Sequence, residues 1–254
     1  MKFTAVLLAG SRPKQDEFAA QFGTDMKALI AVGGEPMVRR PARALLASRK
    51  IAQLIILSQA PERVANVISG DPRIQFEKSL GTIAETMLAM CSDPATRWPL
   101  LVTTADHALL DSATVDEFAR GAAGSDIAIG VVERQNLLQR LPKTERTWLK
   151  FRGGAYTGAN LFALSSPKVR PAIEFWRAVE QDRKKGWRLV GLLGPIVLVG
   201  TALKLLRIDD VLARASRKLG LKIRAVQLSD PLAGVDVDKP ADHSLVEEIL
   251  AGKA

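Results

Sequence analysis

The feature that most constrains this chain is a regular alternation of short apolar runs with amphipathic segments of helical periodicity. Four apolar runs are typical of strands buried on both faces, and they cover residues 3–9, 53–58, 100–104 and 126–132. The segments of helical periodicity cover residues 36–48, 61–68, 82–90, 112–121, 166–182, 208–219 and 240–251. Strands that alternate with helices over short connections predict a mainly parallel sheet with helices on both faces. Because the chain has neither an internal repeat nor a low-complexity linker, residues 1–254 are expected to form one α/β domain.

In parallel α/β sheets ligands bind beyond the carboxyl ends of the strands, so the residues after each run are the first candidates for chemistry. The first run ends in Leu-Ala-Gly-Ser-Arg, where Gly10 lets a phosphate approach the backbone and Arg12 adds a fixed positive charge. Lys27 follows, and its ammonium could neutralise charge that develops during phosphoryl transfer. An ordinary strand-to-helix turn is the alternative interpretation of this segment.

The run at 100–104 is followed by Asp106, a carboxylate at the edge where ligands bind. Mg²⁺ prefers oxygen ligands and bridges phosphate oxygens, so an acid in this position suits a metal site. The alternative is that Asp106 caps the next helix. Asp111 is the better cap because Ser112 begins that helix, and His107 is expected to be a neighbour of the site and not a ligand.

A second group of acids lies near the C-terminus, in the segment Asp236-Val-Asp238-Lys-Pro240-Ala-Asp242. An extended backbone would place Asp236 and Asp238 on the same side, and two adjacent carboxylates need a cation or protons to compensate their charge. Pro240 suits the first position of a helix, and Asp242 suits its first turn, where the helix dipole favours an acid.

Three segments together resemble the opening signature of the nucleotidyltransferase superfamily: Leu-Ala-Gly at 8–10 with the arginine after it, Lys-Ala-Leu at 27–29, and Gly-Gly-Glu-Pro-Met at 33–37. The superfamily includes molybdenum-cofactor guanylyltransferase-like (MobA-like) enzymes and the cytidylyltransferases of sugar and alditol phosphates. The resemblance implies a single Rossmann-like, GT-A-type three-layer α/β sandwich. The family loop usually reads G-G-x-G-x-R, whereas Ser11 and Arg12 follow Gly10 directly here, so Lys14 is an alternative to Arg12.

The resemblance also implies a role for each part of the site. The residues expected to bind the nucleotide are Leu8, Ala9, Gly10, Ser11, Ser79, Gly81 and Thr82. Ser79 or Thr82 could instead simply cap the following helix. Arg12 and Lys27 are expected to be the catalytic residues that contact the triphosphate, with Mg²⁺ as the cofactor. The residues expected to bind this metal are Asp106 and Asp238. Asp238 best matches the acid of the family's late D-x-D-x-P-x-D stretch, and Asp236 is the alternative to it. The acceptor-binding candidates are Lys143, Lys150, Gly158 and Asn160.

The basic excess of the chain is confined to one segment. Residues 133–188 carry 13 basic and 5 acidic side chains, and the whole chain has a net charge of +9. This segment could face phosphates, an anionic membrane or nucleic acid, or it could be a solvated surface. Residues 189–206 then form an apolar run, for which we expect a buried helical pair. A peripheral membrane contact through 184–207 and a homodimer surface are the alternatives. Residues 133–207 are thus expected to form the acceptor side of the domain.

The resemblance implies a metal-dependent nucleotidyltransferase that transfers a nucleoside monophosphate from an NTP to a small phosphorylated acceptor and releases pyrophosphate. CTP is favoured as the NTP, and the acceptor is expected to be a sugar, alditol or lipid-precursor phosphate. The single cysteine, Cys91, excludes an intrachain disulfide and suits a cytoplasmic location. If residues 184–207 contact the membrane, the protein is expected at the inner face of the membrane.

Two alternative functions are consistent with parts of the chain. A GT-A glycosyltransferase would share the fold, but such enzymes usually have a D-x-D pair on a middle strand, and Asp106 has Thr104 and Ala108 two residues to either side. A basic nucleic-acid-binding protein would explain residues 133–188. Single-stranded nucleic acids bind to basic residues interleaved with aromatic residues on which bases stack. The chain lacks such a pattern and has just one tyrosine, so no nucleic acid is expected as a partner.

Overall fold

The structure of the protein, a computed structural model, describes residues 1–10, 17–68, 70–79, 81–181 and 205–253. The predictions for Ser11, Arg12 and Lys14, and those for most of 184–207, fall outside the described residues. Among the described helices, none is both long enough and apolar enough to cross a membrane.

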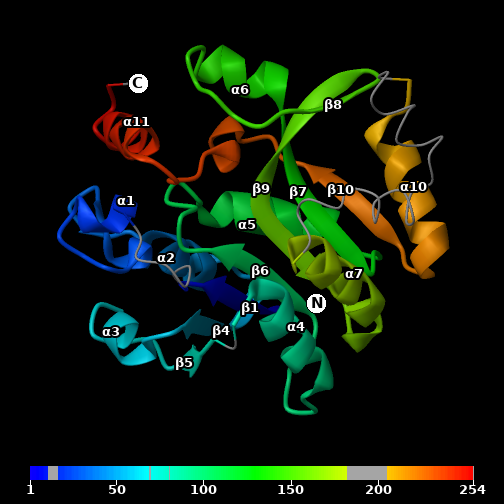
Figure 1. Cartoon of the computed structure of the whole chain (residues 1–254), viewed down its shortest axis with the longest axis horizontal. Helices are drawn as coiled ribbons and strands as arrows, with labels where there is room; N and C mark the ends of the chain where they lie inside the picture. Colours follow the sequence, from blue (N-terminus) through cyan, green and yellow to red (C-terminus); the bar gives the residue numbers. More distant parts are fainter. Residues whose placement is uncertain (11–16, 69, 80, 182–204, 254) are drawn as a thin grey trace.

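The described residues contain a central sheet of eight strands (Figure 1). These strands are β1 (Phe3–Leu8), β4 (Ile51–Ser58), β5 (Ile74–Lys78), β6 (Leu100–Thr104), β7 (Ile127–Glu133), β8 (Leu149–Phe151), β9 (Gly154–Leu164) and β10 (Ile223–Gln227). Their order is β10-β7-β9-β6-β1-β4-β5, with β8 paired to β9, and a small separate sheet joins β2 (Ala31–Val32) to β3 (Glu35–Pro36). Only β9, among the strands of the long path, runs antiparallel to its neighbours. The predicted mainly parallel sheet is therefore confirmed.

Helices cover both faces of this sheet, as expected for a three-layer α/β fold. The α-helices are α1 (Glu17–Ala20), α2 (Arg39–Ala47), α3 (Pro61–Ala65), α4 (Ile83–Ser92), α5 (Ser112–Gly121), α6 (Arg134–Arg140), α7 (Arg170–Gln181), α10 (Ile208–Leu219) and α11 (Pro240–Leu250). Short 3-10 turns are η1 (Lys27–Leu29), η2 (Pro167–Val169) and η3 (Pro231–Gly234).

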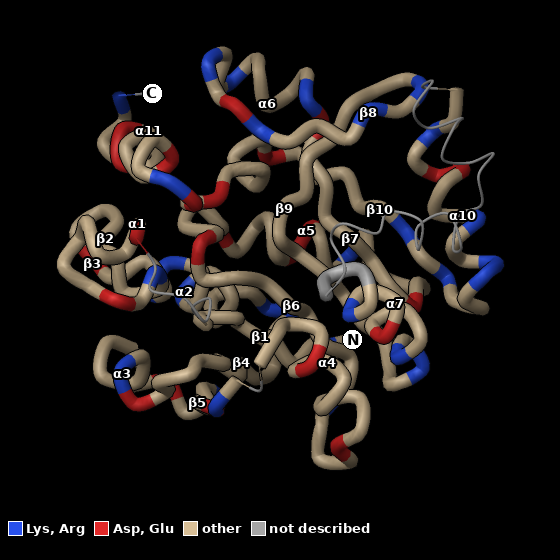
Figure 2. The backbone as a smooth tube through the Cα atoms, in the orientation of Figure 1, with Lys and Arg blue, Asp and Glu red and all other residues tan. Residues whose placement is uncertain are grey.

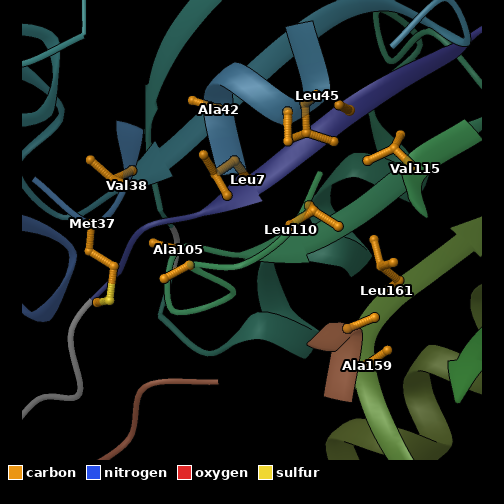
Figure 3. Packing of buried hydrophobic residues seen from close by; sticks show 14 of the residues in the cluster. Leu7, Met37, Val38, Ala42, Leu45, Ala105, Leu110, Val115, Ala159 and Leu161 are labelled. Atoms are coloured by element: carbon orange, nitrogen blue, oxygen red, sulfur yellow. The ribbon is translucent and has the colours of Figure 1, made fainter. Parts of the chain in front are cut away.

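Alternate side chains of β1 enter two different cores, because successive residues of a strand point to opposite faces of the sheet. Leu7 packs in one buried cluster with Leu45 of α2 and Val115 of α5, as Figure 3 shows. Val6 belongs to the other cluster, which contains Met87 of α4. The central strands are thus buried on both faces. In sheets of this kind ligands bind at the carboxyl ends of the strands, so the ends of β1 and β6 are the places to look for a site.

Candidate active site

A lysine and two aspartates from three distant parts of the chain meet beyond the carboxyl ends of β1 and β6. The ammonium of Lys27, at the start of η1, donates to Asp106 Oδ2 at 2.7 Å and to Asp238 Oδ1 at 2.5 Å. Asp106 follows β6, and Asp238 lies shortly before α11. The structure therefore brings together three of the residues that the sequence nominated for phosphate and metal chemistry.

The backbone around this ion-pair cluster is held by hydrogen bonds between the same segments. The N–H of Ala105 donates to the carbonyl of Leu8 at 2.9 Å, which continues the pairing of β1 with β6. The N–H of Val237 donates to the carbonyl of Asp106 at 3.0 Å, and the Thr104 hydroxyl donates to Asp106 Oδ1. The two acid-bearing segments are therefore joined through their backbones, one residue away from Asp238.

Partial burial strengthens these ion pairs. The side chains of Lys27 and Asp106 are 18% and 19% exposed, whereas that of Asp238 is 56% exposed. Burial by itself lowers the pKa of Lys27, but the charges and hydrogen bonds of Asp106 and Asp238 outweigh burial, so its pKa is raised. Lys27 is consequently protonated and carries its positive charge at this point.

The chemistry of the two acids fits a Mg²⁺ site. Oxygens of Asp106 and Asp238 converge on one point that a cation, the Lys27 ammonium, already occupies. The described residues contain no cluster of three or more His, Cys, Asp or Glu side chains that could hold a metal alone. Mg²⁺ in phosphate-transfer sites typically uses one or two carboxylates and takes its other ligands from water and substrate phosphates, so two aspartates suffice.

Asp236, the alternative metal ligand, has different partners. Its Oδ1 accepts from Arg146 Nη1, and its Oδ2 accepts from Asn160 Nδ2 at 3.2 Å. Burial raises the pKa of Asp236, and the nearby charge of Asp238 raises it further. Both carboxylate oxygens of Asp236 are thus engaged by the protein, while Asp238 faces the lysine.

Arg146 is the residue of this site that the sequence did not single out. Its side chain is only 8% exposed, and its Nη2 contacts the carbonyl oxygen of Asp236 at 3.2 Å and Asp242 Oδ1 at 3.4 Å. Asp242 lies in the first turn of α11, as predicted, and its Oδ2 accepts from the N–H groups of Asp238 and Lys239, each at 3.1 Å. Arg146 therefore clamps the segment that carries Asp238.

A polar cavity of about 420 Å³ adjoins Asp238. Its lining consists of Glu145, Arg146, Thr147, Thr157, Asp236, Asp238, Lys239 and Asp242. Of the four acceptor candidates, Asn160 contacts Asp236, and Gly158 follows Thr157 in β9. Lys143 and Lys150 are exposed and do not line this cavity.

Asn160 adopts an unusual backbone conformation. Its φ of 48° is the one positive value among the described non-glycine residues, and asparagine tolerates this left-handed region better than most residues. The pairing of β7 with β9 shifts register between Ile129 and Val131, opposite this part of β9. Such irregularities re-aim side chains, and here the Asn160 amide reaches Asp236.

The nucleotide-side candidates lie at the ends of β1 and β5. Leu8 ends β1, the buried Ala9 donates its N–H to the Leu57 carbonyl at 2.8 Å, and Gly10 is exposed. Thr82 caps α4, and its hydroxyl and Glu85 form a capping box.

The segment before this cap contains the other two candidates. Gly81 has a φ of 75°, which favours glycine. The hydroxyl of Ser79 is buried and has no hydrogen-bond partner among the described residues. Thr82 thus serves as the cap of α4, whereas no described residue engages the Ser79 hydroxyl.

The helix-cap alternative for Asp106 does not hold. The N–H of Thr114 donates to Asp111 Oδ1 at 2.7 Å, so Asp111 caps α5 as predicted. His107, next to Asp106, is almost fully buried, and burial lowers its pKa to about 4. His107 is therefore neutral at physiological pH and contributes no charge to the site.

Comparison with solved structures identifies proteins of similar fold. A hypothetical transferase from Thermus thermophilus is 29% identical with a TM-score of 0.80, over 96% of this chain and 100% of that chain. The 4-diphosphocytidyl-2C-methyl-D-erythritol synthase of Anaerococcus prevotii is 10% identical with a TM-score of 0.61, over 98% and 96% of the two chains. A CMP:2-keto-3-deoxy-manno-octonic acid synthetase, solved with CTP, is 11% identical with a TM-score of 0.57, and both chains are covered completely (100%). At 10–11% identity, the last two establish similarity of fold only.

The sequence of the chain also matches a known family. A search of curated proteins found no match. The family model of the MobA-like NTP transferase domain, however, matches residues 5–192, which are most of the chain and include Lys27 and Asp106. The protein therefore belongs to the MobA-like NTP transferase domain family and is a nucleotidyltransferase.

Proposed function

We propose that this nucleotidyltransferase transfers a nucleoside monophosphate from an NTP to a small phosphorylated acceptor, with release of pyrophosphate. The observation that carries the proposal is the convergence of Lys27, Asp106 and Asp238 on one point beyond the strand ends. CTP is favoured as the donor, since structural neighbours include a synthetase solved with CTP and a diphosphocytidyl synthase. The acceptor classes are sugar, alditol and lipid-precursor phosphates.

In the proposed mechanism Asp106 and Asp238 would hold Mg²⁺. When bound there, Mg²⁺ would neutralise charge on the triphosphate and on the leaving pyrophosphate. Lys27 would donate to triphosphate oxygens from the same point, and Arg12, which lies outside the described residues, is proposed to do so as well. Ser79 and Gly81 would contact the nucleoside.

The chemical step is a single displacement. An oxygen of the acceptor phosphate attacks the α-phosphorus of the NTP, and the bond from that phosphorus to the oxygen bridging the β-phosphate breaks. The electron pair of the broken bond leaves with pyrophosphate. No protein nucleophile is required because the acceptor phosphate is itself a nucleophile, so the protein contributes alignment and charge stabilisation.

The acceptor is proposed to bind in the polar cavity beside Asp238. The side chains of Lys239, Thr147 and Thr157 in its lining can donate hydrogen bonds to phosphate or hydroxyl groups. Asn160, through its hydrogen bond to Asp236, and Gly158, which follows Thr157 in β9, would support the lining of this cavity. Lys143 and Lys150 would contact an acceptor group that extends beyond the cavity. Figure 2 shows further Lys and Arg residues along α6, β8, α7 and α10, which would attract an anionic substrate.

A pyrophosphate-release screen tests the proposed function. The four NTPs are each combined with sugar, alditol and lipid-precursor phosphates in the presence of Mg²⁺. We expect turnover with CTP, and we expect Asp106→Asn to abolish it without a large change in the melting temperature. Asp209→Asn, which alters an exposed acid in the first turn of α10, is the matched control and should remain active. Full activity of Asp106→Asn would refute the assignment of the metal ligand.

A further inference from the structure

The ammonium of Lys27 lies where the proposed metal would lie. It is 2.7 Å from Asp106 Oδ2 and 2.5 Å from Asp238 Oδ1, so one monovalent cation joins both carboxylates. Mg²⁺ binds carboxylate oxygens at about 2.0–2.1 Å. A metal ion that used these same two oxygens would therefore compete with the lysine ammonium for them.

We propose that Lys27 is an exchangeable resident cation that makes metal binding depend on the nucleotide. Without NTP, Lys27 holds Asp106 and Asp238 together and blocks a divalent metal. When NTP binds, its triphosphate gives the ammonium a new anionic partner, and the metal takes the position between the two aspartates. This proposal rests on the proposed function, because it uses the same metal ligands.

The charges of the groups involved favour such an exchange. The lysine and two aspartates together carry a net charge of −1, so the pair of acids is only partly compensated in the resting state. A divalent metal would compensate both acids, but it would first have to displace the Lys27 ammonium, which would lose both partners while its side chain is only 18% exposed. The triphosphate removes this penalty because it binds the displaced ammonium, and a ligand shifts an equilibrium only through such a difference in affinity.

The surrounding backbone limits the movement to the lysine side chain. The carbonyl of Lys27 accepts from the N–H of Ile30 at 3.1 Å, and the N–H of Leu29 donates to Met26 at 2.9 Å. Met26 and Ala28, on either side of Lys27, are buried. Lysine has four rotatable methylene bonds between this fixed backbone and its ammonium, so the charge can move by several ångströms while η1 stays in place.

Direct measurement of Mn²⁺ binding by electron paramagnetic resonance tests the exchange without relying on turnover. Wild-type protein without nucleotide should bind Mn²⁺ weakly. Lys27→Met, which removes the ammonium and keeps the length of the side chain, should bind Mn²⁺ about tenfold or more tightly under the same conditions. The double variant Lys27→Met/Asp106→Asn should lose this gain, which locates the metal at these acids.

Two controls and a nucleotide series complete the experiment. Lys218→Met removes the same charge from an exposed position in the last turn of α10 and should leave Mn²⁺ binding unchanged. Lys27→Arg retains a cation and should bind Mn²⁺ as weakly as the wild type. Adding a non-hydrolysable CTP analogue should raise the Mn²⁺ affinity of the wild type by about tenfold or more, and that of Lys27→Met by clearly less. If Lys27→Met does not fold, Lys27→Gln is measured in its place.

Equal Mn²⁺ affinity of wild type and Lys27→Met in the absence of nucleotide overturns the resident-cation proposal. Tight Mn²⁺ binding to the nucleotide-free wild type does the same. These outcomes are separable from failure of the proposed function, which would appear as absence of pyrophosphate release from every NTP. An enzyme that turns over with Mg²⁺ but fails the Mn²⁺ comparison would retain its function and lose only the exchange.

Discussion

Replacing Arg146 by methionine should destabilise the protein and loosen the segment that carries Asp238. The guanidinium is the cation shared by Asp236 and Asp242, whose side chains are 29% and 8% exposed. Methionine retains much of the apolar stem of Arg146 but leaves these two carboxylates without their positive partner. Because the acids are largely buried, solvent replaces the lost interaction only in part.

The size of the effect follows from the partners that remain. Removing one partner of a buried ion pair costs about 3–5 kcal/mol. Asp236 keeps its hydrogen bond from Asn160 and some solvent, and Asp242 keeps two backbone N–H donors. We therefore expect a somewhat smaller loss than this range, about 2–4 kcal/mol in the free energy of unfolding.

Urea unfolding at pH 7.5 measures this loss. Arg146→Lys keeps the charge but cannot form the same forked contacts, so it should lose less than Arg146→Met. Arg177→Met, an exposed arginine on α7, is the matched control and should change stability by less than about 0.5 kcal/mol. In the double variant Arg146→Met/Asp236→Asn, removal of the uncompensated charge should restore part of the loss. A loss below about 0.5 kcal/mol for Arg146→Met would show that the clamp contributes little, and the reasoning would fail.

The remaining predictions concern His107 and residues 184–207. Burial lowers the pKa of His107 from 6.5 to about 4. Between these pH values the imidazole is protonated in the unfolded chain but not in the folded chain. The free energy of unfolding should therefore fall as the pH decreases from 6.5 to 4. The expected contribution is about 3 kcal/mol at the acid end. Urea unfolding in the presence of EDTA measures this dependence on pH. The free energy of unfolding of His107→Leu should vary less with pH than that of the wild type, and an identical dependence in the two proteins would contradict the prediction. For 184–207 we expect no flotation with anionic liposomes at low salt, because the apolar run is predicted to belong to the core. Flotation that fades with added salt, and in Lys184→Glu/Lys185→Glu, would instead assign a peripheral membrane contact.

The elements that sequence analysis located correctly are those with a strong local pattern. The run at 100–104 coincides with β6, and the segments at 112–121 and 208–219 coincide with α5 and α10. By contrast, β5 at Ile74–Lys78 was missed because it is an edge strand whose Gln75 and Glu77 are exposed. Local periodicity also does not contain the antiparallel direction of β9, which depends on its pairing with β6 and β7.

The site was predictable to the level of strand ends and not of individual contacts. The position of Asp106 follows from the rule that ligands bind beyond the carboxyl ends of parallel strands. Asp238 was nominated by its match to the family's late D-x-D-x-P-x-D stretch, and in the structure it follows η3 and not a strand. Arg146 carried no signal of its own, since it is one of 13 basic residues between 133 and 188. Its importance comes from burial beside Asp236 and Asp242, which are 90 and 96 residues further along the chain.

Asp236 and Asp238 have different partners, and only the three-dimensional arrangement distinguishes them. Two residues of spacing in an extended segment suggest a shared role, and the sequence left the choice of metal ligand open. In the structure the N–H of Val237, between them, is bonded to the carbonyl of Asp106, so this segment is anchored at its midpoint. On one side of the anchor Asp236 is bound by Arg146 and Asn160, and on the other Asp238 meets Lys27. Asp236 therefore supports the segment from the side of the polar cavity, whereas Asp238 would remain available for the proposed exchange between the lysine and a metal.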